Sequence, residues 1–294
     1  MANNMTIAVL SGKGGAGKTF VSVNLAKALA NALGDKSVSY CDCDVEEPNG
    51  FLFFGDREDE ESISVSVKNP SFDLEKCVSC RECVNKCAFN AIAFIKNKPK
   101  LMGGICHSCG ACVLACGQNA VSEVDREIGL LSKARQGRLS LVEGRLNLGE
   151  ATGVSLIDSV IKEGQKSRVT ILDCPPGSAC SAMECVKNAD YLLIVGEPTA
   201  YGVHDLEMVL ELAKVFKAQN QGLKLGFVIN KAEEESNILK DFLDENDLPL
   251  KEQIPFQRET ASAISRGYLA YDSIASLREI FDRLARDIIL EVGI

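Results

Sequence analysis

Eight cysteines in two runs are the residues of this sequence with the clearest chemistry. Both runs share one spacing, with two residues between successive members of the first three cysteines and three residues before the fourth. The runs consist of Cys77, Cys80, Cys83 and Cys87, and of Cys106, Cys109, Cys112 and Cys116. Thiolates at such short intervals converge on a metal centre from one stretch of backbone, so two matched sets of four predict two metal centres.

A second chemical motif lies upstream, where residues 12–19 read GKGGAGKT and form a complete phosphate-binding loop. Its glycines let backbone N–H groups face phosphates without a side chain in the way. We expect Lys18 to neutralise the β- and γ-phosphates and the Thr19 hydroxyl to bind Mg²⁺, which predicts a site for ATP or ADP with Mg²⁺. The residues expected to contact the nucleotide here are Gly12, Gly14, Gly15, Ala16, Gly17, Lys18, Thr19 and Phe20.

Short apolar runs that alternate with amphipathic segments indicate the elements that position these residues. Strands are predicted at 6–10, 38–41, 169–172, 191–195 and 225–229, and helices at 20–33 and 204–216. This alternation predicts the α/β class, with a P-loop nucleotide-hydrolase fold, a mostly parallel sheet and helices on both faces. The acidic stretch 56–61 is expected to form a solvated loop.

The cysteine-rich segment is an internal repeat that interrupts this fold. Its halves open at Cys77 and Cys106 and close on the similar tails 89–92 and 118–121. Residues 69–125 are therefore predicted to form a small α+β domain, inserted between parts 1–68 and 126–294 of the nucleotide-binding domain. The cysteine spacing resembles that of bacterial two-cluster ferredoxins, in which the fourth cysteine of each run ligates the other run's cluster.

The ferredoxin resemblance implies two 4Fe–4S clusters with crossed ligand sets. One set would be Cys77, Cys80, Cys83 and Cys116, and the other Cys106, Cys109, Cys112 and Cys87. Zinc is the alternative, because C-x2-C pairs also suit tetrahedral zinc. The segment departs from the ferredoxin pattern at Ala88 and Gly117, where proline normally follows the fourth cysteine. This departure puts the local turn geometry in doubt but leaves the number of ligands unchanged.

The charge of residues 69–125 suggests a type of redox partner. Six basic and five acidic side chains make the segment nearly neutral. Each oxidised cluster with its four thiolates would add about two negative charges. The loaded segment as a whole is therefore expected to be anionic and to suit a basic patch on a redox partner.

Lys13, directly after the first glycine of the loop, is not required by the general phosphate-loop pattern. With it, the loop resembles the deviant P-loop of the MinD, ParA and nitrogenase iron protein superfamily. In that superfamily this lysine reaches the nucleotide held by a partner subunit, so the resemblance implies an ATP-dependent homodimer.

Three further matches to this superfamily follow predicted strands, at the edge where parallel sheets bind nucleotides. Asp44 matches the switch aspartate, which is expected to position the attacking water and approach Mg²⁺. Asp173 matches the Walker B aspartate, and Asn230 matches the asparagine that reads the adenine edge. The resemblance thus implies catalytic roles for Lys13, Lys18, Asp44 and Asp173.

Over essentially its whole length the chain resembles MinD-superfamily ATPases that contain an inserted ferredoxin domain, including at 42–49, 142–150 and 197–205. This group is related to the Mrp/Nbp-type iron–sulfur carriers. The resemblance implies a Mg-ATP-dependent dimeric ATPase that couples hydrolysis to assembly or transfer of iron–sulfur or related metal clusters. Its partner would be a redox protein or an apo-metalloprotein. Two alternatives stay open: an ATP-gated electron donor to a partner enzyme, and a redox-sensing, MinD-like regulatory ATPase.

Five cysteines lie outside the two runs. Cys41, Cys43, Cys174 and Cys185 are expected to pack in the core, where free cysteine is often found. Cys180 follows Asp173 by seven residues, and the nitrogenase iron protein has a cluster-binding cysteine at the corresponding offset. This match gives the hypothesis that Cys180 from two subunits faces a shared or transient cluster, and the alternative is a buried thiol.

Composition narrows the other classes of partner. A net charge of −9 argues against binding to nucleic acid. No apolar run reaches the length of a membrane span, and the start of the chain lacks the basic residues of a signal peptide. The amphipathic stretch 274–294 has a net negative polar face, which predicts packing against the sheet rather than on anionic lipid. We therefore expect a cytoplasmic protein with no membrane partner.

Overall fold

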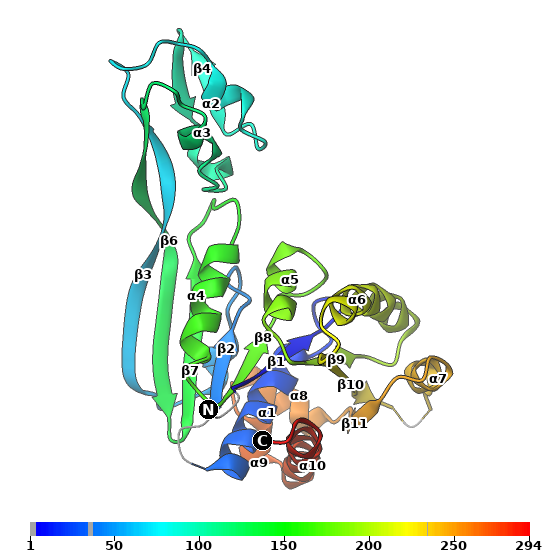
Figure 1. The fold of residues 1–294 in the computed structure, drawn as a ribbon. Helices are drawn as coiled ribbons and strands as arrows, with labels where there is room; N and C mark the ends of the chain where they lie inside the picture. Colours follow the sequence, from blue (N-terminus) through cyan, green and yellow to red (C-terminus); the bar gives the residue numbers. More distant parts are fainter. Residues whose placement is uncertain (1–3, 35–37, 234) are drawn as a thin grey trace.

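The computed structural model describes residues 4–34, 38–233 and 235–294. Their central element is a nine-stranded sheet in the order β11-β10-β9-β1-β8-β2-β7-β6-β3 (Figure 1). The first seven strands of this order run parallel, and β6 and β3 continue the sheet as antiparallel neighbours. The parallel strands are β1 (Met5–Leu10), β2 (Val38–Asp42), β7 (Leu139–Leu146), β8 (Val169–Asp173), β9 (Tyr191–Gly196), β10 (Lys224–Ala232) and β11 (Leu250–Pro255).

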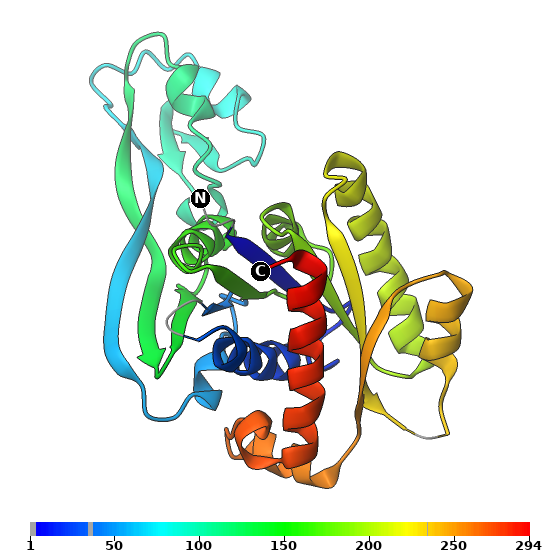
Figure 2. The ribbon, with the colours of Figure 1, turned by 60° about the horizontal axis from the view of Figure 1, so that its bottom comes forward.

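Helices cover both faces of the sheet because its strands bury side chains on both sides. In β1, Ile7 and Val9 enter one hydrophobic cluster while Ala8 and Leu10 enter the other. The first face is covered by α1 (Lys18–Leu33), α9 (Ala270–Ser273) and α10 (Ala275–Val292) (Figure 2). The second is covered by α4 (Val154–Gly164), α5 (Cys180–Lys187), α6 (Ala200–Gln219) and α7 (Ile238–Glu245). The predicted α/β architecture is confirmed.

The C-terminal helix α10 packs against both α1 and β11, so its predicted packing against the sheet is confirmed and is shared with a helix. Leu277, Phe281 and Leu284 on its inner face are fully buried, and the rings of Phe20 and Phe281 meet edge to face at 5.8 Å. Among the described residues, no helix combines the length and the apolar character needed to cross a lipid bilayer.

A long antiparallel ribbon carries the cysteine-rich segment. It is formed by β3 (Glu58–Phe72) and β6 (Val121–Gln136), which pair from Glu58–Arg135 to Phe72–Val121. The prediction of a loop at 56–61 is wrong, because Glu58 begins β3. Opposite charges pair these strands, with Lys133 2.9 Å from Glu61, and cross-strand ion pairs need no hydrophobic run.

The ribbon leaves the sheet at the edge where the parallel strands end. β6 pairs with β7 only from Gly129 onward, and Gly129 lies opposite Leu146 at the carboxyl end of β7. The eight residues 121–128 therefore project beyond this edge by about 25 Å. Figure 1 shows the cysteine-rich segment held away from the sheet at the end of this ribbon.

The segment at the end of the ribbon, hereafter the insert, has its own small core. Cys83, Ile92, Cys112 and Val121 form this core. Its elements are α2 (Glu82–Asn85), β4 (Ile92–Ile95), β5 (Lys98–Leu101), η2 (Gly103–Ile105) and α3 (Ala111–Leu114). The ribbon runs continuously through residues 69 and 125, so the boundaries predicted there fall inside strands and stay predictions.

Candidate functional site

A cleft of about 840 Å³ lies at the carboxyl edge of the sheet, beside the phosphate loop. Its other walls come from η1 (Gly50–Phe53), the end of β11 and α8 (Arg258–Ser265). It brings together most of the residues predicted to act on a nucleotide: Lys13, Gly14, Gly15, Gly17, Lys18, Thr19, Phe20, Asp44 and Asn230. Gly12 and Ala16 line a neighbouring small pocket instead, and Asp173 is fully buried beneath the loop.

Lys18 and Asp173 form a buried ion pair. Lys18 Nζ donates to Asp173 Oδ1 at 2.9 Å, and the Ser22 and Tyr40 hydroxyls also donate to this carboxylate. Burial acts to lower the pKa of Lys18, but the Asp173 carboxylate outweighs it and the pKa is raised. Lys18 is therefore positively charged, and its charge is balanced by the Asp173 carboxylate.

Two aspartates follow β2 and have different surroundings. Asp42 is buried, and its carboxylate accepts hydrogen bonds from the backbone N–H groups of Asp44, Asn49 and Gly50. Burial, together with the nearby Asp173 carboxylate, raises the pKa of Asp42 to about 8. Asp44 is half-buried and lines the cleft. Of the two, Asp44 is the carboxylate that lines the cleft, and its role beside the attacking water stays a prediction.

Lys13 is held within its own chain. Its Nζ lies 2.6 Å from Glu197 Oε1 and 3.7 Å from Asp205 Oδ2. Lys231 joins the same cluster, because its Nζ donates to Glu197 Oε2 at 3.1 Å and to the Gly15 carbonyl at 2.7 Å. Burial acts to raise the pKa of Glu197, but the hydrogen bonds from Lys13 and Lys231 hold it below its usual range. Sequence reasoning did not identify Glu197, Asp205 or Lys231 as neighbours of the phosphate loop.

Asn230 supports the loop from below. Its Nδ2 donates to the Ala16 carbonyl at 2.9 Å. Gly17, with φ of 91°, approaches this amide so closely that a Cβ at position 17 would collide with Nδ2. Asn230 also borders the cleft, so its predicted contact with adenine is compatible with this position.

The wall of the cleft that the sequence did not predict lies after β11. Gln257 Oε1 and Thr260 Oγ1 are buried there without a hydrogen-bond partner among the described residues, and Phe256 is exposed beside them. Unpaired buried polar atoms are costly, so these positions favour a polar ligand. Recognising β11 as a strand would have revealed them, because its carboxyl end meets the same edge.

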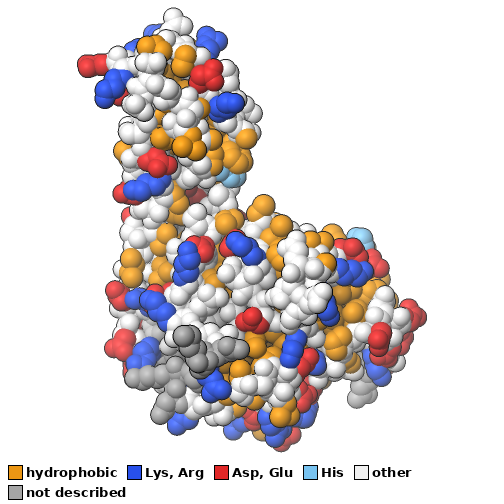
Figure 3. Space-filling view, viewed as in Figure 1, with side chains coloured by type: hydrophobic (Ala, Val, Ile, Leu, Met, Phe, Trp, Pro, Cys, Tyr) orange, Lys and Arg blue, Asp and Glu red, His pale blue; other side chains and the backbone are white. Residues whose placement is uncertain are grey.

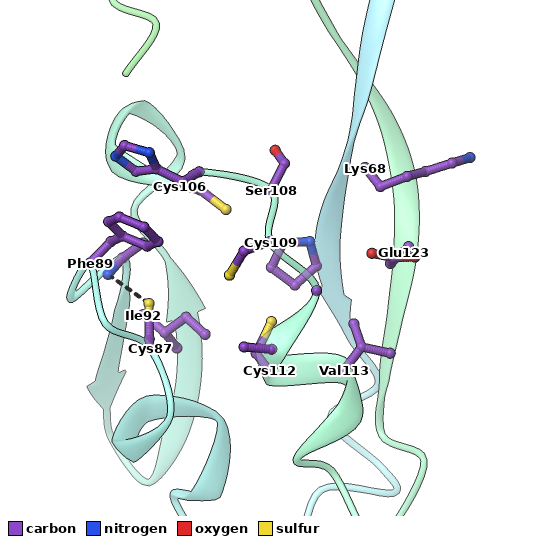
Figure 4. A pocket seen from close by; sticks show the side chains of 15 residues that line it. Lys68, Cys87, Phe89, Ile92, Cys106, Ser108, Cys109, Cys112, Val113 and Glu123 are labelled. Atoms are coloured by element: carbon purple, nitrogen blue, oxygen red, sulfur yellow. Dashed lines mark hydrogen bonds between the residues drawn. The ribbon is translucent and has the colours of Figure 1, made fainter. Parts of the chain in front are cut away.

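Two small pockets in the insert each collect four cysteines, one from each position of the repeat. The first, here the distal pocket, is lined by Cys77, Cys80, Cys83 and Cys116. The second, here the proximal pocket, is lined by Cys87, Cys106, Cys109 and Cys112. In Figure 4 the four thiols of the proximal pocket point into one shared space. These groupings are the two crossed sets that the ferredoxin resemblance implies.

The two halves of the insert repeat the same backbone. Positive φ angles occur at Ser79 and Ser108 (63° and 54°) and at Arg81 and Gly110 (66° and 72°), each pair 29 residues apart. In both halves the N–H four residues after the last cysteine donates to its sulfur, from Ala91 to Cys87 at 3.2 Å and from Ala120 to Cys116 at 3.3 Å. The sequence repeat is thus a structural repeat.

No group of three or more His, Cys, Asp or Glu side chains in the described part of the chain is close enough to hold a single metal ion. Four sulfurs around one zinc ion would lie about 3.8 Å apart, whereas a four-iron cube separates its thiolates more widely. His107 is exposed and stacks on Phe89, with 3.8 Å between the ring centroids.

The five remaining cysteines differ in burial. Cys41, Cys43, Cys174 and Cys185 are fully buried, so their predicted packing in the core is confirmed. Cys180 is exposed at the first turn of α5, so the alternative of a buried thiol is wrong. Its predicted contact with a shared cluster stays a hypothesis.

Comparison with known proteins identifies the family of the nucleotide-binding part. Residues 7–270 match the family model of CobQ/CobB/MinD/ParA nucleotide-binding domains. The uncharacterized protein MJ0578 of Methanocaldococcus jannaschii is 32% identical over 286 residues, which cover 95% of this chain and 96% of that protein.

Solved structures share the fold at lower identity. The septum site-determining protein MinD of Pyrococcus horikoshii, complexed with Mg-ADP, has a TM-score of 0.58 at 19% identity and covers 99% of this chain and 98% of its own. The ATP complex of McdA from Cyanothece has a TM-score of 0.59 at 16% identity, covering 100% and 98%. The chain therefore belongs to the CobQ/CobB/MinD/ParA family of nucleotide-binding domains and is a P-loop ATPase of the MinD/ParA type.

Proposed function

We propose that this protein is a Mg-ATP-dependent, dimeric ATPase whose nucleotide state gates electron transfer through two 4Fe–4S clusters in a ferredoxin-type insert. The family supplies the ATPase, and the two cysteine pockets support the clusters. Of the functions expected from the sequence, gated electron transfer agrees best with pockets built into a folded module. Cys83 and Cys112 belong to the core of the insert, so a cluster bound there would be resident rather than cargo.

The cysteine pockets suit 4Fe–4S clusters by the chemistry of their donors. Each offers four thiols, and Cys87 and Cys116 accept a hydrogen bond from a backbone N–H that would stabilise a thiolate. A 4Fe–4S cluster would supply one-electron redox chemistry at each pocket. The chain's own contribution is to enclose the thiolates and to direct N–H dipoles at their sulfurs, which favours a more reduced, more negative cluster.

At the nucleotide edge, the ion pair between Lys18 and Asp173 supports a two-state site. A β- or γ-phosphate in the cleft would compete for Lys18 and release the Asp173 carboxylate toward Mg²⁺, with the Thr19 hydroxyl as a second ligand. Asp44 would orient the attacking water and respond to the presence of the γ-phosphate. The relatives with bound Mg-ADP and ATP support nucleotide and Mg²⁺ as the ligands.

Dimerisation through the nucleotide face would recruit Lys13. In the single chain this lysine is bound to Glu197 and Asp205. Reaching a partner's nucleotide requires that these contacts break, and the phosphates of that nucleotide would replace the carboxylates as counter-charges.

One chain of contacts between the switch aspartate and the proximal pocket carries this proposal. Val45, next to Asp44, accepts a backbone hydrogen bond from Leu146 at 2.8 Å, and Asn147 donates to Ile128 of the ribbon at 2.8 Å. The following loop meets the insert, because a Cβ at Gly104 would lie 3.3 Å from the Gly149 carbonyl oxygen.

An ion pair ties the same loop to the ribbon a second time. Arg126 of β6 donates to Glu150 at 2.5 Å, and the Glu150 side chain is largely buried. Movement of Asp44 and Val45 is thereby linked, through residues 146–150, to both the ribbon and the loop that precedes Cys106. This linkage supports nucleotide control of the insert.

The test is an anaerobic measurement on the full chain in three steps. Iron and sulfide are counted first, and about eight irons per chain are expected. The midpoint potentials are then measured with MgATP and with MgADP, and a shift between the two is expected. Glu150→Gln, which weakens the link between loop and ribbon, should reduce that shift, whereas the matched change Glu58→Gln at the exposed start of β3 should leave it intact.

The outcomes separate the parts of the proposal. Zinc in place of iron would contradict the clusters. Midpoint potentials that are the same with MgATP and with MgADP would contradict gating but would not contradict the presence of the clusters.

Cluster assembly or transfer is the second candidate, and the exposed thiol of Cys180 favours it. Transfer of iron and sulfide to an apo-acceptor, lost in Cys180→Ala and retained in Cys185→Ala, would support this function. Unchanged iron content and unchanged transfer in Cys180→Ala would remove Cys180 from any cluster site.

A further inference from the structure

The two cysteine pockets have different surroundings although the repeat relates them. At one pair of equivalent positions, the distal pocket has Val78 and the proximal pocket has His107. At another pair, Leu114 lies two residues before Cys116 of the distal pocket, and Asn85 lies two residues before Cys87 of the proximal pocket. Val78 is 62% exposed and Leu114 is 90% exposed. At these two positions the half with the apolar residue belongs to the distal pocket, whereas at a third equivalent pair the proximal pocket has Phe89 and the distal pocket has Gln118.

The distal pocket is also the one farther from the ATPase sheet. It is bordered by Phe72 and Val121, at the far end of the ribbon. The proximal pocket is bordered by Lys68, Pro70 and Glu123, which lie closer to the sheet along the same ribbon. The contact of Gly104 with Gly149 likewise places the loop before Cys106 next to the nucleotide domain. The distal pocket thus faces outward, away from the switches.

Positive charge in the insert is concentrated in residues 74–101, and Lys68 of the ribbon borders the proximal pocket. Residues 74–101 contain six Lys and Arg against two Glu, a net charge of +4, while residues 102–120 contain none of these four charged types. Near neutrality over the whole insert conceals this division. The six basic residues, Lys76, Arg81, Lys86, Lys96, Lys98 and Lys100, are all exposed.

Hydrogen bonds and a cation–π contact connect two of these cations to the first cysteine loop. Lys98 Nζ donates to the Leu74 carbonyl at 2.6 Å, and Ser79 donates to the Asn97 carbonyl at 2.6 Å, which draws the turn at 96–98 against residues 74–82. Arg81 lies over the Phe94 ring, 4.6 Å from its centroid. Figure 3 shows Lys and Arg side chains next to hydrophobic ones at the outer end of the insert, hereafter the tip.

We propose that this tip surface, which includes the exposed side chains of Val78, Leu114, Lys86, Lys96 and Lys100, docks an acidic one-electron carrier protein. The inference rests on the proposed function, because the carrier would exchange its electron through the distal pocket. Specific interfaces usually combine exposed apolar side chains with a polar or charged surround. A cluster at the distal pocket would contribute about −2, which leaves the surrounding surface positive. For this surface the proposal differs from the expectation of a basic partner, which was drawn from the charge of the whole insert.

The test is the affinity of the anaerobically prepared, iron-loaded chain for a small acidic 4Fe–4S ferredoxin, measured calorimetrically at low and high ionic strength. The triple variant Lys86→Glu, Lys96→Glu, Lys100→Glu is expected to bind about tenfold more weakly at low salt, with little remaining salt dependence. A matched control reverses three exposed cations elsewhere, with Lys217→Glu, Lys240→Glu and Arg286→Glu, and should bind like wild type. Leu114→Gln should weaken binding at both salt concentrations, unlike Leu290→Gln on α10.

Each result decides between the surface and the function beneath it. If the iron-loaded wild type and the iron-loaded tip variants bind the ferredoxin with equal affinity, the docking surface is overturned and the proposed clusters are not affected. Tighter binding of a basic carrier, or of single-stranded nucleic acid, than of the acidic ferredoxin would also overturn it. A wild-type chain that binds no iron would overturn both the docking surface and the proposed function, because the pockets would then hold no redox group.

Discussion

The nucleotide edge and the insert present their functional groups in opposite ways. At the nucleotide edge these groups are already paired with one another: Lys18 with Asp173, Lys13 with Glu197, and Asn230 with the Ala16 carbonyl. In the insert, the thiols of the proximal pocket point into a common space (Figure 4). A ligand at the nucleotide edge must replace internal partners, whereas a ligand in the insert enters a prepared pocket.

This difference indicates that conformational change would begin at the nucleotide edge rather than in the insert. Replacing an internal ion pair by a ligand changes the contacts of the residues that made it, so nucleotide binding can be converted into movement. A pocket built from short local turns keeps its shape and suits a permanent group. The loop 146–150 lies between the two regions and is the place where movement at one edge would meet the rigid module at the other.

The largest effect on ATP hydrolysis and stability is expected from removal of the Lys18 side chain. Lys18→Ala is expected to lower ATP hydrolysis by at least about 100-fold, because no cation would replace it beside the transferring phosphate. It also leaves Asp173 buried without its counter-charge, a loss that typically costs about 3–5 kcal/mol of stability. Steady-state hydrolysis and thermal unfolding, each with and without MgATP, would measure the two effects.

A control separates the two consequences of this change. Lys217→Ala removes an exposed lysine from α6 and should alter neither quantity. Hydrolysis by Lys18→Ala within tenfold of wild type would show that Lys18 serves the fold rather than the nucleotide.

The insert can be tested by paired cysteine substitutions that distinguish crossed from uncrossed ligand sets. Cys87→Ser with Cys106→Ser removes two residues of the proximal pocket, so about four of the expected eight irons should remain. Cys83→Ser with Cys87→Ser removes one residue from each pocket, so both clusters should be lost. Anaerobic iron counts on the two double variants provide the comparison.

These two double variants change the same number of cysteines, so each is the other's control. If each run of four held its own cluster, the results would exchange: the first pair would lose both clusters and the second would keep one.

Local patterns made much of this molecule predictable from its sequence. The apolar runs of β1, β8 and β9 are buried on both faces, which gives a strand an unmistakable composition. The cysteine pockets were also implied, because the spacing alone brings three of the four thiols together. The phosphate loop is a local motif of the same kind.

Features that depend on long-range pairing could not be read in this way. The acidic start of β3 gives no hydrophobic pattern and becomes a strand by pairing with β6, whereas residues 62–67 alternate serine with Ile63, Val65 and Val67, a local strand pattern that the prediction of a loop at 56–61 did not use. Glu197 lies far from Lys13 in the sequence, and no local pattern links the two. The contact between Val45 and Leu146 arises from the neighbouring positions of β2 and β7 in the sheet.

A smaller effect is expected from the buried carboxyl group of Asp42. Because the pKa of Asp42 is raised to about 8, the folded chain binds a proton that the unfolded chain releases near pH 4. This group's contribution to stability is therefore complete below pH 4 and is lost as the pH rises toward 8. Asp42→Asn should remove that loss, so its stability relative to wild type should rise with pH by up to about 1.4 kcal/mol per pH unit.

Chemical denaturation of the nucleotide-free chain at pH 5 to 8 measures this difference. Asp241→Asn, an exposed aspartate on α7, is the matched control and should follow wild type throughout. A wild-type chain that gains stability relative to Asp42→Asn as the pH rises would show that Asp42 is ionised in the fold.

The smallest expected effect concerns the release of Lys13. Glu197→Gln removes the charge that holds Lys13 at 2.6 Å while leaving Asp205 nearby. A partly exposed ion pair contributes about 1 kcal/mol or less, so ATP-dependent dimerisation should tighten by no more than about fivefold. Analytical ultracentrifugation with MgATP would measure the dimer dissociation constant, and Glu245→Gln on α7 supplies the same change of charge away from the loop. Lys13→Ala should abolish the gain in a double variant, because the freed lysine is its cause. Dimerisation that weakens in Glu197→Gln would instead mean that Glu197 itself contacts the partner, and the nucleotide edge would then be less self-contained than the comparison with the insert implies.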